Sequence, residues 1–189
     1  SRSLSVLPLR SFAFNSSILL QQNGNAAIKG TLLQKGFPAE ITVMKTYDKK
    51  EDEITNLFNG QIGGNGLIIN DISLDKKIEW QDIQTQINFS GMVQRYYKST
   101  GKRIFIPISW HTWEPNLKNT SEVYMEEVNI KKHRSLNTES IPPSLSITED
   151  NYELKMEIII DDENILIKKQ IQFTDTDRLS EEEQSELLI

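Results

Sequence analysis

The residues from Tyr152 to Phe173 read YELKMEIII DDEN ILIKKQIQF, which is the clearest structural signal in the chain. Apolar side chains alternate from Tyr152 to Ile160 and again from Ile165 to Phe173, and this is the period of a strand with one buried face. Residues 161–164 separate the two runs and favour a turn. We therefore predict a β-hairpin. Because an isolated hairpin is marginal in water, we expect the rest of the chain to cover its apolar face.

The same alternation predicts further strands along the chain. We expect a hairpin within residues 4–35 with Asn23-Gly24 at its turn, and a strand over residues 39–47 that starts just after Pro38. A long strand is expected from Ile83 to Val93, and Gly91 within it indicates a bulge or a close approach of another backbone segment. Shorter strands are expected over 67–69, 103–108, 123–130 and 145–147.

Two segments show helix signals instead. Residues 54, 57 and 58 are apolar at helical spacing and follow the acidic run Glu51-Asp52-Glu53, so one short internal helix is expected within residues 48–58. Ser180 followed by Glu183 is a capping-box pattern, which predicts a frayed C-terminal helix.

These elements predict an all-β fold, namely an antiparallel β-sandwich with one short internal helix and a frayed C-terminal helix. We expect one β-sandwich domain over residues 1–179 and a helical tail over residues 180–189. Two β-subdomains that meet near residues 95–102 are the alternative division.

Composition excludes several classes of function. The 189 residues carry a net charge of −6, and the basic cluster Lys131 to Arg134 is flanked by acidic residues, so no nucleic-acid partner is expected. No apolar run approaches the ~20 residues that span a bilayer, so no membrane insertion is expected. The absence of cysteine excludes disulfides, thiolate metal sites and cysteine nucleophiles. The chain starts at Ser1 without a signal-type block, and we expect it to be a fragment of a longer protein.

No motif in the sequence identifies a reaction. His111 and His133 stand apart and form no metal-binding pair, and no Gly-x-Ser-x-Gly sequence is present. The acidic turn Asp161-Asp162-Glu163 supplies too few oxygens for calcium. The glycines of residues 60–66 lack the strand-loop-helix context and the lysine of a phosphate-binding loop. We therefore predict no catalytic residue, no metal and no cofactor, while a triad of distant residues stays the weakest alternative.

Aromatic residues are the sharpest candidates for a binding site. The group comprises Trp80, Tyr96, Tyr97, Trp110 and Trp113. In the interpretation that we favour, Trp80 and one of the other two tryptophans fill the core, because large aromatic side chains dominate buried area. In the alternative, Trp110, Trp113, Tyr96 and Tyr97 are exposed and stack on a sugar or hold a peptide.

The order of the segments resembles that of a known family. The segments that carry the resemblance are Asn23-Gly24-Asn25, Gly36-Phe37-Pro38-Ala39, Ile83 to Val93, Gly101 to Pro107, Ile141-Pro142 and Tyr152 to Phe173. In this order they resemble the C-terminal β-domain of bacterial transglutaminase-like envelope proteins of the Bacteroidetes type. The catalytic Cys, His and Asp of that family lie in its core domain, so the resemblance transfers no catalytic role to this chain.

The resemblance implies a non-catalytic accessory domain of a larger bacterial envelope protein, located in the periplasm or cell envelope. Such a domain packs on the transglutaminase-like core or binds a protein partner. It should present one contiguous apolar patch or one bare strand edge. A carbohydrate-binding module that uses Trp110 and Trp113 with a tyrosine of the 96–97 pair is the alternative, and its partner would be a glycan.

Overall fold

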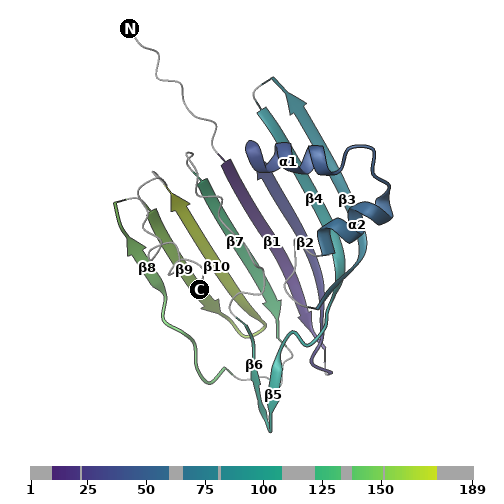
Figure 1. The fold of residues 1–189 in the computed structure, drawn as a ribbon. Helices are drawn as coiled ribbons and strands as arrows, with labels where there is room; N and C mark the ends of the chain where they lie inside the picture. The colour runs from purple at the N-terminus through teal and green to yellow at the C-terminus, as the bar shows by residue number, and fades with distance from the viewer. Residues whose placement is uncertain are drawn as a thin grey trace.

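The computed structural model describes residues 10–21, 23–59, 66–80, 82–107, 122–132, 138–150 and 152–173. These residues are mostly in strands, with two short helices, and the predicted all-β class is confirmed (Figure 1). The helices are α1 (Phe37–Lys45) and α2 (Glu51–Asn59). The strands are β1 (Arg10–Leu20), β2 (Ala26–Lys35), β3 (Leu67–Glu79), β4 (Asp82–Val93), β5 (Lys98–Thr100), β6 (Arg103–Phe105), β7 (Glu122–Lys131), β8 (Leu145–Thr148), β9 (Tyr152–Ile160) and β10 (Asn164–Phe173).

Eight of the described strands form one large sheet in the order β3-β4-β2-β1-β7-β10-β9-β8, and β5 and β6 form a separate two-stranded ribbon. A large and a small sheet are consistent with the predicted sandwich. Neighbouring strands are antiparallel with one departure, because β1 and β7 are parallel. This pair joins the strands on either side of residues 95–102 into one continuous sheet. The predicted tail over residues 180–189 lies outside the described residues.

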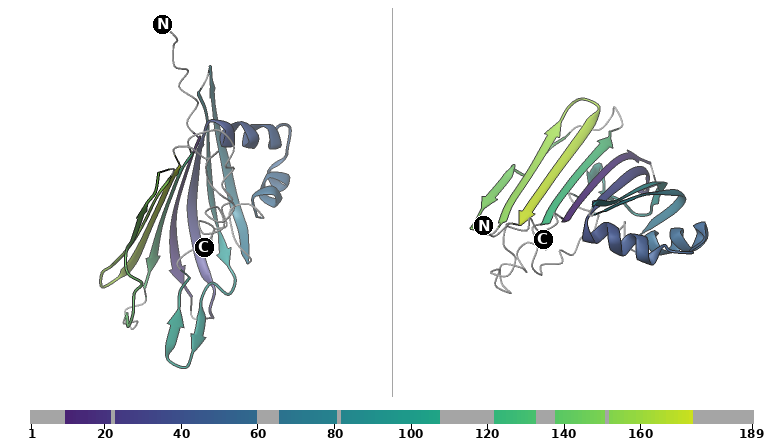
Figure 2. Two further views of the ribbon diagram at one scale, coloured as in Figure 1. Left: turned by 60° about the vertical axis from the view of Figure 1, so that its left-hand side comes forward. Right: turned by 90° about the horizontal axis from the view of Figure 1, so that it is seen from above.

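The large sheet is strongly bent, and both helices lie on one side of it (Figure 2). We call this side the inner face and the opposite side the outer face. Register places the buried side chains of neighbouring strands on the inner face, because facing residues of paired strands point to the same side. Its fully buried members include Phe14, Ile18, Ile28, Ile87, Tyr124, Val128, Ile130, Ile171 and Phe173.

Helix α1 replaces the strand predicted over residues 39–47, and that prediction is wrong. The apolar residues 39, 41 and 43 alternate, but the side chains that are buried are Pro38, Ala39 and Thr42, which share one face of a helix. Gly36 has a φ of 69°, which lets the chain leave β2 sharply, and Pro38 fits the first helical turn, where no N–H is needed. Because the residues on the buried face are small or polar, the pattern of apolar residues in the sequence does not show the helical period.

Helix α2 confirms the predicted internal helix. Phe58 is buried in the core cluster that the inner face forms with this helix. Asn59, its last residue, accepts a hydrogen bond from the Ile69 amide at its Oδ1 atom, at 2.8 Å, which fixes the end of α2 against β3. The two helices therefore cover the β2-β4-β3 part of the inner face, as Figure 1 shows.

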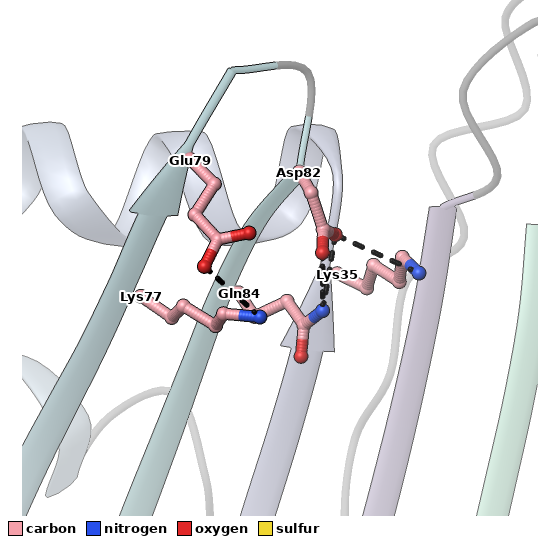
Figure 3. A network of polar contacts seen from close by, with 5 residues as sticks. All are labelled: Lys35, Lys77, Glu79, Asp82 and Gln84. Carbon is pink, nitrogen blue, oxygen red and sulfur yellow. Dashed lines mark hydrogen bonds and ion pairs between the residues drawn. The ribbon is translucent and has the colours of Figure 1, made fainter.

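The β3–β4 hairpin is fixed by a close backbone approach and by surface charges. An added Cβ at Gly91 would collide with the carbonyl oxygen of Ile68, and β3 has an irregular register between Ile69 and Asp71, so the close approach expected at Gly91 is confirmed. At the tip, Asp82 accepts two hydrogen bonds from Gln84 and lies 3.6 Å from the Lys35 ammonium (Figure 3).

Trp80 lies beside this network at the hairpin tip. Its side chain is 92% exposed, so the prediction that Trp80 fills the core is wrong. The tip extends past the helices, and no described element lies close enough to cover the ring. A single exposed tryptophan is normal on a protein surface and is not by itself evidence of a binding site.

The predicted turn after β9 is confirmed. Asp161 Oδ1 accepts hydrogen bonds from the backbone amides of Glu163 at 2.8 Å and Asn164 at 2.6 Å. These backbone hydrogen bonds hold the pKa of the Asp161 carboxyl below its usual value. The Asp161 carboxylate thus accepts hydrogen bonds from the backbone of its own turn, and this arrangement is an Asx-turn.

Candidate functional site

Four isoleucine side chains form an apolar square on the inner face, where β9 turns into β10. Ile158 faces Ile167 and Ile160 faces Ile165 in the register of the two strands, so all four side chains point to one side. Ile104 of β6 and Ile106 just after it complete the lining of a cavity of about 530 Å³. We call it the isoleucine cavity. Its lining joins residues from β6, from the segment before β8 and from the ends of β9 and β10, strands that Figure 1 labels.

The lip of the isoleucine cavity carries two exposed apolar side chains. Residues 138–142, which lead into β8, line one side of the cavity. On this lip the Ile141 side chain is 48% exposed, and Phe105 on β6 is 60% exposed. Exposed apolar groups around a cavity favour the binding of an apolar ligand, because the ligand removes them from water.

The mouth of the isoleucine cavity carries a positive charge. Among the described residues, its lining includes Lys102, Arg103 and Lys132 and one acidic residue, Glu139. Arg103 Nε lies 2.9 Å from Glu139 Oε2, so these two charges neutralise each other. Lys132 Nζ donates to the backbone carbonyl of Asp161 at 2.6 Å. The Asp161 carboxylate, whose pKa is lowered mainly by backbone hydrogen bonds and in smaller part by the Lys132 ammonium, offsets part of the Lys132 charge. Lys102 and the remainder of the Lys132 charge leave a local positive potential among the described lining residues of a chain of net charge −6.

A second depression, of about 540 Å³, lies on the outer face and is polar. Its outer-face lining comes from β1, β2, β3, β4 and β7 and comprises Asn15, Ser17, Lys29, Thr31, Asp71, Ser73, Asn88, Ser90 and Glu127. Thr31 donates to Asn88 Oδ1 at 3.0 Å, and Asn88 donates to Ser73 Oγ at 3.4 Å. We call it the polar groove. Its hydroxyl, amide and carboxylate groups offer hydrogen bonds to a polar ligand.

A buried carboxyl group lies on the inner face of β7. Glu126 is 3% exposed, and its Oε2 atom accepts a hydrogen bond from the Tyr124 hydroxyl at 3.1 Å. In the register it lies between Phe14 on β1 and Lys169 on β10. Within the described part of the chain, Glu126 Oε1 has no hydrogen-bond partner, and neither has the hydroxyl of the buried Tyr96.

Burial is the main cause of the shifted pKa values of Glu126, Tyr96 and Tyr124. Removal from water raises the pKa of Glu126, while the Tyr124 hydroxyl and the Lys169 ammonium oppose that rise. Burial and the nearby Glu126 carboxylate also raise the pKa values of Tyr96 and Tyr124. Both tyrosines thus stay protonated at neutral pH, and the carboxyl is biased toward its neutral form. An acid of this kind can influence stability without contacting any ligand.

The aromatic residues predicted to bind a ligand are not brought together on the described surface. Tyr96 is 5% exposed and packs in the main core, so its predicted stacking role is wrong. The Tyr97 ring is half-buried, and its hydroxyl donates to the backbone carbonyl of Gln21. Trp110 and Trp113 lie outside the described residues, so their role stays a prediction.

Sequence reasoning missed the isoleucine cavity and the buried acid for different reasons. The cavity combines residues 102–106, 138–142 and 158–167, and no local pattern shows that these segments meet. The buried acid had a local signal, because Glu126 occupies the same alternating register as Tyr124, Val128 and Ile130.

In the described ranges, no group of three or more histidine, cysteine or acidic side chains is placed to hold a metal ion. His111 and His133 lie outside those ranges. Neither described helix has the length and apolarity needed to cross a bilayer. The chain matches no protein-family model and no curated protein sequence. The site therefore has to be interpreted from its geometry.

Proposed function

We propose that this chain is a non-catalytic binding domain, an accessory domain of a larger bacterial envelope protein with a transglutaminase-like core. It acts in the periplasm or cell envelope, where its isoleucine cavity holds an apolar group of a partner. The observation that carries the proposal is the cavity of about 530 Å³, which lies within the size range of ligand pockets and has an apolar floor with Phe105 and Ile141 exposed at its lip.

The lip supports a binding role more directly than the floor does. Large apolar side chains at the surface are common singly, but Phe105 and Ile141 lie on one cavity and continue into its isoleucine lining. Their position supports the proposal, because a domain that docks a partner is expected to present a contiguous apolar patch. The bare edge of β8, which pairs only with β9 among the described strands, adds backbone groups that a partner can reach.

Binding to the cavity is tested with Nile red, an uncharged apolar dye whose fluorescence rises out of water. We expect the purified chain to bind the dye, and we expect Phe105→Ser combined with Ile141→Ser to weaken binding severalfold. Tyr47→Ser combined with Ile78→Ser is the matched control, because both side chains are exposed away from the cavity. Equal loss of dye in both double variants, or no binding by the parent chain, would contradict the proposal.

The envelope context has a separate test. The polypeptide that contains this chain should also contain a Cys, a His and an Asp with transglutaminase-like spacing, and antibodies should detect it in the envelope or periplasmic fraction. Detection in the cytosolic fraction, or a complete reading frame without those three residues, would remove the accessory-domain part of the proposal while leaving the cavity test intact.

The polar groove favours carbohydrate binding as a second candidate function. Its hydroxyl and amide groups suit a ligand rich in hydroxyls, although it lacks an exposed aromatic ring among its described residues. If a glycan binds there, Asn15→Ala combined with Ser90→Ala should abolish retardation of the folded chain in gels that contain soluble polysaccharide. If Trp110→Ala and Trp113→Ala abolish it instead, the predicted tryptophan site is responsible.

A further inference from the structure

We propose that the ligand of the isoleucine cavity is a single-chain anionic amphiphile, with an acyl chain in the cavity and a carboxylate at its mouth. This inference rests on the proposed binding function and names the chemical class of the ligand. Two independent features of the cavity carry it, namely the chemistry of its floor and the charge of its rim.

The floor suits an alkyl chain. Ile158, Ile160, Ile165 and Ile167 contribute only methyl and methylene groups on adjacent strands, and Ile104 and Ile106 face the same space. The side-chain hydroxyls in the lining are those of Thr138 and Ser140, both on the exposed segment that leads into β8. The six isoleucine side chains of the floor offer a ligand no hydrogen bond, which an alkyl chain tolerates and a peptide backbone does not.

The rim suits an anion. Once Arg103 and Glu139 have paired, Lys102 remains as a cation among the described lining residues, and Lys132 adds the part of its charge that the Asp161 carboxylate does not offset. The bond from Lys132 Nζ to the Asp161 carbonyl uses one of its three donors and positions the ammonium at the β9–β10 end. An anionic headgroup gains attraction from both lysines, whereas a cationic headgroup is repelled.

An apolar segment of a protein is the competing occupant. Such a segment would insert one side chain and would leave its own backbone at the lip, where the Phe105 and Ile141 side chains offer no hydrogen bond and partners would have to come from Thr138, Ser140 or the edge of β8. It would also gain nothing from two lysines unless an acidic residue lay at the correct position. A single acyl carboxylate molecule would contact both the apolar floor and the lysines at the mouth of the cavity.

The test measures displacement of Nile red from the folded chain by dodecanoate, by uncharged dodecanol and by cationic dodecyltrimethylammonium, each below its micelle concentration. We expect dodecanoate to bind roughly tenfold more tightly than dodecanol, a factor that two exposed charge contacts can supply. The cation should bind most weakly. From octanoate to dodecanoate, affinity should rise by up to roughly fourfold for each added methylene, as burial of hydrocarbon predicts.

Variants separate the two ends of the ligand. Lys102→Gln combined with Lys132→Gln should reduce dodecanoate affinity to that of dodecanol and leave dodecanol unchanged. Lys29→Gln combined with Lys168→Gln on the outer face is the control and should change neither affinity. Because Lys132 also bonds to a backbone carbonyl, Lys102→Gln alone should show part of the effect in a chain that keeps that contact.

Each contrary outcome has a distinct meaning. Equal affinity for dodecanoate and dodecanol would overturn the anionic headgroup and leave the binding cavity standing. Failure of every amphiphile to displace bound Nile red would overturn the acyl ligand and favour a protein segment. Failure of Nile red itself to bind would overturn both this inference and the proposed function.

Discussion

Glu126 is a carboxyl group in a register that is otherwise occupied by buried apolar and aromatic side chains. Its burial raises its pKa, and the Tyr124 hydroxyl and the Lys169 ammonium compensate in part. A carboxyl whose pKa is raised by folding binds its proton more tightly in the folded state than in the unfolded state. Stability therefore falls as pH rises from the unfolded pKa to the folded pKa and is constant above it.

Glu126→Gln should remove this pH dependence. The amide keeps an oxygen that can accept the Tyr124 hydrogen bond, but it carries no charge at any pH. We expect the variant to be more stable than the parent chain at neutral pH and to lose that advantage below the ordinary glutamate pKa of 4.5. Urea unfolding at a series of pH values measures the difference. Glu127→Gln, on the exposed outer face of the same strand, is the control. An unchanged pH profile for Glu126→Gln would contradict the role assigned to burial.

Gly91→Ala tests the close approach between β3 and β4. The added methyl group would meet the carbonyl oxygen of Ile68, which belongs to a backbone and cannot rotate away. We expect a loss of about 2–3 kcal/mol in the free energy of unfolding, the range of an overpacked core site. Gly101→Ala is the comparison, because nothing lies within 4 Å of a Cβ built there and only its φ of 61° is strained. Denaturant unfolding of both variants ranks them, and a Gly91→Ala variant as stable as the parent chain would refute the close contact.

Among the elements, α1 is attached to the sheet by a shared acceptor. The Gln34 side-chain oxygen on β2 accepts hydrogen bonds from the hydroxyls of Thr42 on α1 at 2.6 Å and Thr85 on β4 at 2.8 Å. All three residues are buried, so water cannot replace the acceptor. The pairing is therefore a polar anchor for a helix whose buried face has few apolar groups.

Gln34→Met should detach this anchor. The substitution keeps the length of the side chain but leaves two buried hydroxyl groups without their acceptor, at a cost of about 2–3 kcal/mol. Hydrogen exchange of the α1 amides should accelerate more than that of α2, which is attached through Asn59. Uniform acceleration in both helices would show that Gln34 stabilises the fold as a whole and does not anchor α1 in particular.

The elements also show what a sequence can and cannot predict. The β9–β10 hairpin was predictable because its alternation and its Asx-turn are both local. Helix α1 was not, because Ala39 and Thr42 bury a face without large apolar residues. The exposure of Trp80 could not be predicted from the local sequence pattern either, because it depends on how far the β3–β4 hairpin extends past the helices. Intrinsic secondary-structure propensity is outweighed where tertiary contacts determine which side chains are buried.

At the scale of the whole molecule, one parallel pair determines where the candidate site forms. The β1–β7 pairing places β9 and β10 in the same sheet as β2, β3 and β4, while both helices cover the latter strands (Figure 2). The isoleucine square at the β9–β10 turn consequently lies away from the helices, and β6 is the described strand that faces it. Such a site depends on contacts distant in sequence, so neither the parallel pair nor the cavity could be predicted from alternation.

The most direct test of the binding cavity uses isoleucine methyl groups observed by NMR. The chain is labelled at its isoleucine methyl groups and titrated with dodecanoate. We expect progressive shifts for Ile104, Ile106, Ile158, Ile160, Ile165 and Ile167, which line the cavity. The methyl groups of Ile28 and Ile87, buried under the helix-covered part of the sheet, should keep their positions. Shifts spread over all isoleucines, or confined to those outside the cavity, would contradict the proposed site.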